Sequence, residues 1–197
     1  MICFDERPCF LIGDTIAPLP AKEGRVKKVN YAYEKLGSCA LMAAIEPLTG
    51  RRLAILNKHR RKREYALFMK ELAAMFPKAI KIRLVQDTLN THDFSSFYET
   101  FPYEEAFALS QRFEFYFTPK SASWLNMIEI EFSALARLCL NRRIPTFEEL
   151  EREIAAFFKD RHLKQVKINW QFSLTSARQK FERHYVKVNP ANKNQKD

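Results

Sequence analysis

Glycine is scarce in this sequence, with only four residues among 197, at positions 13, 24, 37 and 50. An average protein uses about 7% glycine. Phosphate-binding turns such as Gly-x-Gly-x-x-Gly and the Walker loop need several closely spaced glycines, and no such turn can be written from these four. The sequence therefore excludes dinucleotide-binding enzymes and P-loop nucleotide enzymes.

Cysteines and long apolar runs are also few. The four cysteines form no Cys-x-x-Cys pair and have no histidines at zinc spacing nearby, which indicates neither a disulfide framework nor a structural zinc site. The longest apolar run, Cys39–Ile45, has seven residues, whereas a membrane helix needs about 20. No cationic region precedes an apolar one at the N-terminus, which argues against a signal peptide. We expect a cytoplasmic protein without a membrane segment.

Positive charge, in contrast, is abundant. The chain has 33 Lys and Arg against 23 Asp and Glu, a net charge of +10, and residues 51–63 contain seven Lys or Arg and no acid. Such a block suits DNA, because each cation set against a phosphate releases a condensed counterion. The same block also fits a solvated loop and helix start. The predicted DNA contacts are Arg60, Arg61, Lys62, Arg63 and Lys120.

Hydrophobic periodicity predicts one mixed α/β domain. Alternating or continuous apolar runs predict strands at 2–4, 37–46, 52–57, 80–85 and 113–117, with a loop from residue 5 to about 30. Helical spacing predicts helices at 64–76, about 125–141, 146–160 and 174–185, and a short helix capped by Asn90 or Thr91. Thr146 followed by Glu149 is a capping-box signature. We expect a domain over 1–186 and a polar, disordered tail over 187–197.

Acidic residues lie where the predicted strands end. Asp5 and Asp87 follow two strands, and Glu129 and Glu131 open the helix after the last strand. Ligands of α/β sheets gather at the carboxyl ends of strands, and converging carboxylates suit hard cations such as Mg²⁺. Most exposed acids are simply solvated, however. Periodicity also does not choose between Glu129 and Glu131, which flank opposite borders of one apolar stripe.

Five strings together resemble the motif blocks of one protein family. They are DERP from Asp5, QDTLNTH from Gln86, FTPK from Phe117, SWLNMIEIE from Ser123 and NWQFS from Asn169. In this order they resemble the blocks of bacterial insertion-sequence transposases related to the mariner elements, the six-thirty group of the DDE superfamily. The resemblance extends from Phe4 to about Tyr185. The second and fourth strings are long and specific, whereas DERP alone is weak.

This resemblance implies a fold, a chemistry and a set of site residues. It implies a ribonuclease-H-like mixed five-stranded sheet flanked by helices. It also implies a catalytic triad of Asp5, Asp87 and Glu129 that binds two Mg²⁺ or Mn²⁺ ions for DNA strand cleavage and strand transfer. The family's Leu-Asn-x-x-Glu spacing selects Glu129 and leaves Glu131 a structural or electrostatic role. Thr88 and the segment 120–123 depart from the family pattern without touching the triad.

Other residues in these strings have weaker functional interpretations. Trp124 either stacks on a base or packs beneath the active-site helix, with packing favoured. Asn126 either caps that helix or orients Glu129. His92, close to Asn90 in the second string, either positions a phosphate or a water molecule, or caps and packs. Trp170 and Phe172 are predicted to anchor the last helix.

The resemblance also sets expectations about partners. Full-length relatives have an N-terminal helix-turn-helix region that reads the element's ends, and we expect this region to be absent here. The predicted partners are DNA and either a second copy of the chain or a helix-turn-helix polypeptide from an upstream reading frame. The competing hypothesis is a truncated, catalytically silent DNA-binding remnant, or an inhibitor of intact transposase.

Overall fold

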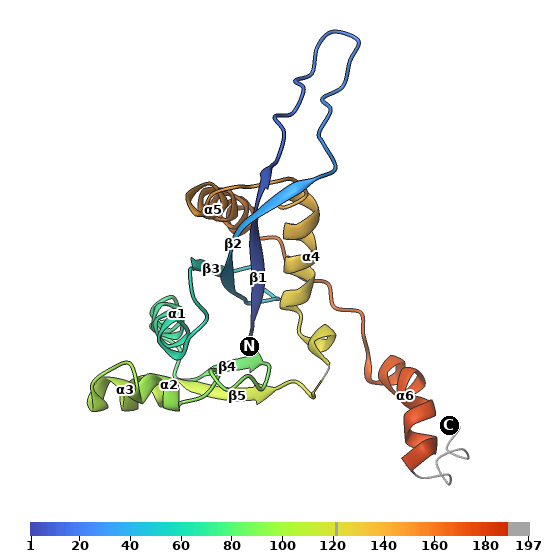
Figure 1. Ribbon diagram of the computed structural model, residues 1–197. Coiled ribbons are helices and arrows are strands. Elements are labelled where there is room, and N and C mark those ends of the chain that lie inside the picture. The colour runs from blue at the N-terminus through green and yellow to red at the C-terminus, as the bar shows by residue number, and fades with distance from the viewer. Residues whose placement is uncertain (121, 189–197) are drawn as a thin grey trace.

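A five-stranded mixed sheet forms the centre of the computed structural model, which describes residues 1–120 and 122–188 except for the side chains of 183–185. The strand order is β3-β2-β1-β4-β5, and helices flank the sheet (Figure 1). The strands are β1 (Ile2–Asp14), β2 (Tyr33–Ile45), β3 (Arg52–Asn57), β4 (Ile82–Gln86) and β5 (Phe113–Phe117). The predicted mixed five-stranded sheet flanked by helices is confirmed.

The pairing of the strands gives three of them the same direction. β1, β2 and β3 pair antiparallel, whereas β4 pairs parallel to β1 and β5 parallel to β4. β1, β4 and β5 therefore run in the same direction. In such sheets, ligands bind beyond the carboxyl ends of the parallel strands, so the segments after β4 and β5 are where a site is expected.

β1 is much longer than the sequence predicts. The expected strand stops at residue 4, but the observed one continues through Asp5 and Pro8 to Asp14, paired with β2 throughout. The Glu6 N–H donates to the Asp5 side chain, and the Ile12 N–H donates to the Ile144 carbonyl, outside the sheet. Pro8 lies an even number of residues from both and has the same orientation in the strand. A proline there removes no bond to β2, so neither the acids nor Pro8 interrupts the strand.

Apolar side chains cover both faces of the sheet. One core packs Phe4, Leu84 and Phe113 against the first three helices, and the other packs Cys3, Leu41 and Ile45 against the next two. The helices are α1 (Lys62–Ala74), α2 (Ser95–Tyr98), α3 (Tyr103–Ser110), α4 (Ile128–Leu138), α5 (Phe147–Leu163) and α6 (Leu174–Val188), with a 3₁₀ turn, η1 (Ser123–Leu125), before α4. Alternate residues of β1 thus face different helices.

The helix predictions are largely confirmed, with three differences. Thr146 caps α5 by accepting a hydrogen bond from the Glu149 N–H, as predicted. The short helix α2 instead begins after Phe94, and the Asp93 carboxylate accepts from the Ser95 N–H, so Asn90 and Thr91 do not cap it. α3 was not predicted. α6 extends to Val188, and residues 189–197 of the predicted tail lie outside the described residues.

The connection between β1 and β2 forms a long projecting arm, residues 15–32 (Figure 1). Isolated bridges Leu19–Lys28 and Lys22–Arg25 hold its two sides together. Arg143, between α4 and α5, bonds the Asp14 carboxylate and the carbonyls of residues 30, 31 and 32. The base of the arm is therefore fixed to the body of the domain.

Candidate active site

Asp5 and Asp87 lie at corresponding positions on neighbouring strands. β1 pairs with β4 only through Ile2↔Leu84 and Cys3↔Val85. Continued by two residues, this register places Asp5 opposite Asp87, just beyond the last paired residues of β4. Asp5 is thus inside β1 and not at its end, as the sequence suggested, but it lies where β1 runs past the end of its parallel neighbour.

Glu129 comes from the first turn of α4, on the same face of the sheet as Asp5. Asp5 is two residues after Cys3, so their side chains point to the same face of the sheet. The Cys3 side chain packs with residues of α4 on that face. Asn126 joins the two elements, since its Nδ2 donates to the Phe4 carbonyl at 2.7 Å and its Oδ1 accepts from the Ile128 N–H at 3.5 Å. Asn126 therefore fixes the start of α4 against β1, although the helix N-cap position itself is Met127.

The electrostatics of Asp5 show that the acids influence one another. The pKa of Asp5 is raised to about 6, mainly by burial and in part by the charges of Asp87 and Glu129, against the opposing bond from the Glu6 N–H. Burial also raises the pKa of Glu129, whereas Arg7, two residues after Asp5, lowers it. The charges of the acid just after β4 and the acid on α4 thus both act on Asp5.

Asp87 is held by the loop that it begins. Its Oδ1 accepts from the Leu89 N–H at 3.2 Å and lies 2.5 Å from Nδ1 of His92. Asp87 is half-exposed, whereas the His92 side chain is fully buried. The bond to His92 lowers the pKa of Asp87 more than partial burial raises it. Asn90, also predicted as a supporting residue, is exposed in the same loop.

Glu6 is part of this site although the sequence analysis missed it. Its side chain is 3% exposed and lies 3.1 Å from Nε2 of His92 and 3.3 Å from Nε of Arg60. Burial alone would lower the pKa of His92, but the contacts with Asp87 and Glu6 raise it to about 9. The only sequence signal was an acid directly after Asp5 in a strand, where neighbours face opposite sides.

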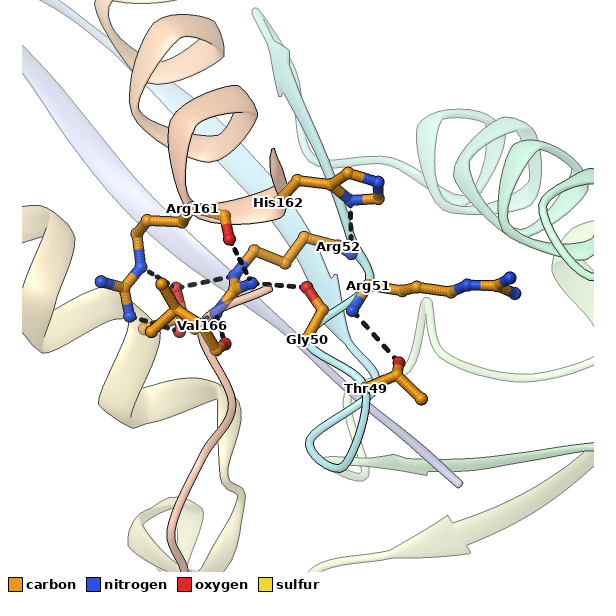
Figure 2. A network of polar contacts seen from close by, with 8 residues as sticks. Thr49, Gly50, Arg51, Arg52, Arg161, His162 and Val166 are labelled. Carbon is orange, nitrogen blue, oxygen red and sulfur yellow. Dashed lines mark hydrogen bonds and ion pairs between the residues drawn. The ribbon is translucent and has the colours of Figure 1, made fainter. Parts of the chain in front are cut away.

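Glu131 has the structural role that the resemblance assigned to it. Its fully buried carboxylate pairs with Arg52 at 2.8 Å and with Arg161 at 2.8 Å. Figure 2 shows the Arg52 side chain reaching between Gly50, Val166 and Arg161, and it donates to the carbonyls of these three residues. The network ties β3, α4 and the end of α5 together, away from the acidic site.

The basic segment 51–63 is only partly a free surface. Arg52 is buried in the Glu131 network, Arg60 contacts Glu6, and Lys62 contacts Glu99 and Ser95. Arg61 and Arg63 are exposed at the start of α1. Lys120, in the segment after β5, is also exposed. Of the predicted DNA contacts, Arg61, Arg63 and Lys120 are therefore the most available.

Trp124 packs against the last helix. Its ring lies 5.2 Å from Phe172 and 5.9 Å from Phe181, and Nζ of Lys180 lies 4.3 Å above it. Trp170 in turn contacts Phe172 edge to face. These aromatic residues connect η1 to α6, which lies apart from the sheet in Figure 1. Trp124 thus packs against α6 and the segment before it, whereas packing beneath the active-site helix was expected, and Trp170 and Phe172 contribute to holding α6.

The acids suit a divalent cation in their chemistry, although they are not gathered into a coordination shell. Among the side chains that the structure describes, no group of three or more His, Cys, Asp or Glu is close enough to hold a metal ion. The donor set is nevertheless made of carboxylates, which Mg²⁺ prefers. The repulsion that Asp87 and Glu129 exert on Asp5 is the kind that a bound cation relieves.

A mixed sheet of this strand order, with acids on β1, just after β4 and on α4, is consistent with a ribonuclease-H-like fold. The sequence profile of the DDE superfamily endonucleases matches residues 1–151. This is more than three quarters of the chain, and the chain belongs to that family. No curated protein sequence matches it significantly. No helix in the described part of the chain is long and apolar enough to cross a membrane.

Proposed function

We propose that this chain is the catalytic domain of a transposase from the mariner-related, six-thirty group of bacterial insertion sequences. It cuts DNA at the ends of the element and joins the freed ends to target DNA. Membership of the DDE superfamily endonucleases supports the nuclease chemistry. The long motifs QDTLNTH and SWLNMIEIE support the narrower group.

In this proposal Asp5, Asp87 and Glu129 hold two Mg²⁺ or Mn²⁺ ions. Such a pair activates an attacking oxygen and stabilises the leaving oxygen in phosphoryl transfer. The chain's own residues fix the ligands: β1 carries Asp5, His92 and the Leu89 N–H hold Asp87, and Asn126 sets the start of the helix that carries Glu129. Arg7, which acts on Glu129, balances part of the negative charge.

DNA is the substrate in this proposal, and exposed cations bind its backbone. Arg61 and Arg63 at the start of α1, together with Lys120 after β5, supply sequence-independent affinity through phosphate contacts. The protein partner in this proposal is either a second copy of the chain or a helix-turn-helix polypeptide.

The observation that carries the proposal is the placement of Asp5 in register with Asp87, on the face of the sheet covered by the helix that bears Glu129, within a DDE-family fold. The test is a nicking assay on supercoiled plasmid with Mg²⁺ or Mn²⁺. We expect Asp87→Asn to reduce metal-dependent nicking by about 100-fold or more, because loss of a ligand costs at least as much as loss of its supporting partner. Asp160→Asn, which changes an exposed acid on α5, is the matched control and should retain full activity.

Equal nicking by the wild-type chain and Asp87→Asn would contradict the proposal. Salt-sensitive DNA binding without any metal-dependent cleavage would instead favour the silent DNA-binding remnant or inhibitor.

A further inference from the structure

His92 lies between two carboxylates from different elements. Its Nδ1 is 2.5 Å from Oδ1 of Asp87, and its Nε2 is 3.1 Å from Oε1 of Glu6. The His92 side chain is fully buried, and that of Glu6 is 3% exposed. An ionised carboxylate only accepts hydrogen bonds. Nδ1 must therefore carry the proton that it shares with Asp87.

Aromatic side chains pack against the imidazole ring. It stacks on the Tyr65 ring with the ring centroids 4.9 Å apart, and it packs edge to face with the Phe4 ring with the centroids 5.2 Å apart. The carbonyl of His92 accepts from Nε2 of Gln86 at 2.9 Å, and Oε1 of Gln86 accepts from the Tyr65 hydroxyl at 2.8 Å. Neither the ring nor its backbone can turn without disturbing the aromatic core. A histidine held so firmly sets the direction of whatever it bonds.

That bonded group is Asp87, and only one of its oxygens is used. Oδ1 accepts from both His92 and the Leu89 N–H. Oδ2 has no hydrogen bond or ion pair within the described residues, and the side chain is 39% exposed. The two bonds at Oδ1 therefore leave Oδ2 as the oxygen available to a ligand.

Glu6 connects this arrangement to the first acid. Asp5 and Glu6 are consecutive in β1, so their side chains leave opposite faces of the sheet. Asp5 faces α4, whereas Glu6 faces the side of Phe4 and Tyr65 and contacts His92. One strand thus carries Asp5 directly and reaches Asp87 through Glu6 and His92.

We infer that Glu6 and His92 are positioning residues that orient Asp87 from the far side of the sheet, presenting Oδ2 to a divalent cation and keeping Asp87 in register with Asp5. This inference rests on the proposed function, because it takes Asp87 as a metal ligand. Supporting partners of this kind typically change metal affinity or activity by about 10–100-fold. A purely structural His92 would instead affect stability alone.

The test measures metal binding without DNA or turnover. Mn²⁺ binding to the full chain is followed by electron paramagnetic resonance for the wild type, His92→Leu, His92→Asn and Glu6→Gln. We expect His92→Leu to weaken Mn²⁺ binding about 10–100-fold. His92→Asn should recover most of the affinity, because its amide can donate from nearly the place of Nδ1. Glu6→Gln keeps the size of the side chain but removes its charge, and it should lower the Mn²⁺ affinity by a smaller, several-fold factor. His59→Asn, on an exposed histidine, is the control.

A second measurement covers the case in which His92→Leu does not fold. In the wild-type chain, titration with Mg²⁺ should shift the ¹⁵N resonance of His92 Nδ1, because metal and imidazole share the Asp87 carboxylate. The shift should be lost in Asp87→Asn.

The outcomes separate the two proposals. If the wild type binds Mn²⁺, Asp87→Asn does not, and folded His92→Leu or Glu6→Gln binds as the wild type does, the positioning role is overturned while the proposed function stands. If the wild type binds metal but the ¹⁵N resonance of His92 does not shift with Mg²⁺, the positioning role is likewise overturned. If the wild type binds no metal, both proposals fail together.

Discussion

At the scale of single residues, the acids of this domain divide into two kinds. Asp5 and Glu129 have no ion pair within the described residues and Asp87 pairs with His92, whereas Glu131 is fully paired with Arg52 and Arg161. Only two positions separate Glu129 from Glu131 in α4, yet they face different surroundings. The helix geometry turns neighbours two apart by about 200°, which accounts for the difference.

Replacement of Glu131 should strongly destabilise the domain. Glu131→Gln leaves the buried Arg52 guanidinium without its counter-charge, and breaking a buried pair in this way costs about 3–5 kcal/mol. Urea denaturation at pH 7 measures the loss. Glu153→Gln, whose partner Arg142 is half-exposed, should cost less than about 1 kcal/mol. Equal losses in the two variants would contradict the assigned role.

The contribution of Glu131 should also depend on pH. Burial raises its pKa, but the bonds from Arg161 and Arg52 outweigh this and lower it below the ordinary value of 4.5. A lowered folded-state pKa gives stability that is present above the unfolded pKa and lost as the pH falls through the folded one. The gap in unfolding free energy between wild type and Glu131→Gln should therefore shrink below about pH 4.5. A gap that stays constant down to pH 3 would show that the charge is not responsible.

At the scale of elements, the sequence predicts those elements whose signals are local. β5 and the cap of α5 were predicted correctly because alternation and a capping box lie within a few residues. The length of β1 was missed because Pro8 and the acids normally end a strand. Proline is tolerated where its side of the strand has no partner strand, and β1 pairs with β4 only at Ile2 and Cys3. The role of Glu131 was not derivable from periodicity, because its partners Arg52 and Arg161 are 79 and 30 positions away.

Glu6 and its contact with His92 could not be predicted for a related reason. The two residues are 86 positions apart, and their contact depends on which face of β1 each side chain leaves. Which residues of the two strands lie side by side depends on the register between β1 and β4, and this register cannot be read from the sequence. The three candidate acids were found because the family motifs mark them, and their catalytic roles remain a prediction.

The turn between β2 and β3 should be especially sensitive to substitution. Gly50 has φ +79°, and a Cβ there would lie 2.8 Å from the carbonyl carbon of Gln165 and 3.0 Å from the Val166 oxygen. Gly50→Ala should cost about 1–2 kcal/mol for the left-handed backbone and about 1–3 kcal/mol more for the collision. Gly24→Ala, with φ +70° and nothing within 4 Å, should show only the first cost. Thermal denaturation compares the two, and similar losses would argue against the close approach.

At the scale of the whole molecule, the net charge of +10 predicts DNA binding that weakens with salt. Not all of this charge is available, because Arg52 is buried and Arg60 and Lys62 have acidic partners. The exposed cations Arg61 and Arg63 are therefore the better test of which face binds DNA.

The double variant Arg61→Ala/Arg63→Ala should weaken binding to DNA of any sequence. Each lost phosphate contact should reduce the slope of log K against log salt by about 0.9, so the pair should reduce it by about 1.8. Fluorescence anisotropy over a salt series measures this slope. Lys159→Ala/Lys164→Ala, near the end and at the C-cap of α5, removes the same charge from a different surface and should leave the slope nearer the wild-type value. Identical slopes for the two double variants would mean that the α1 surface is not specifically used.

The register between β1 and β2 determines where insertions and deletions can be tolerated during evolution. The pairing is regular from Cys3 to Leu11 and shifts only at Leu11/Ile12, on the side of the arm. A slip of one residue nearer the site would exchange the faces of Asp5 and Glu6, sending the first acid into the aromatic core. Because the irregularity lies beyond the site, insertions and deletions in the arm can be absorbed there. The arm is thus free to diversify in length and sequence among descendants of this gene while the geometry of the acids is inherited unchanged.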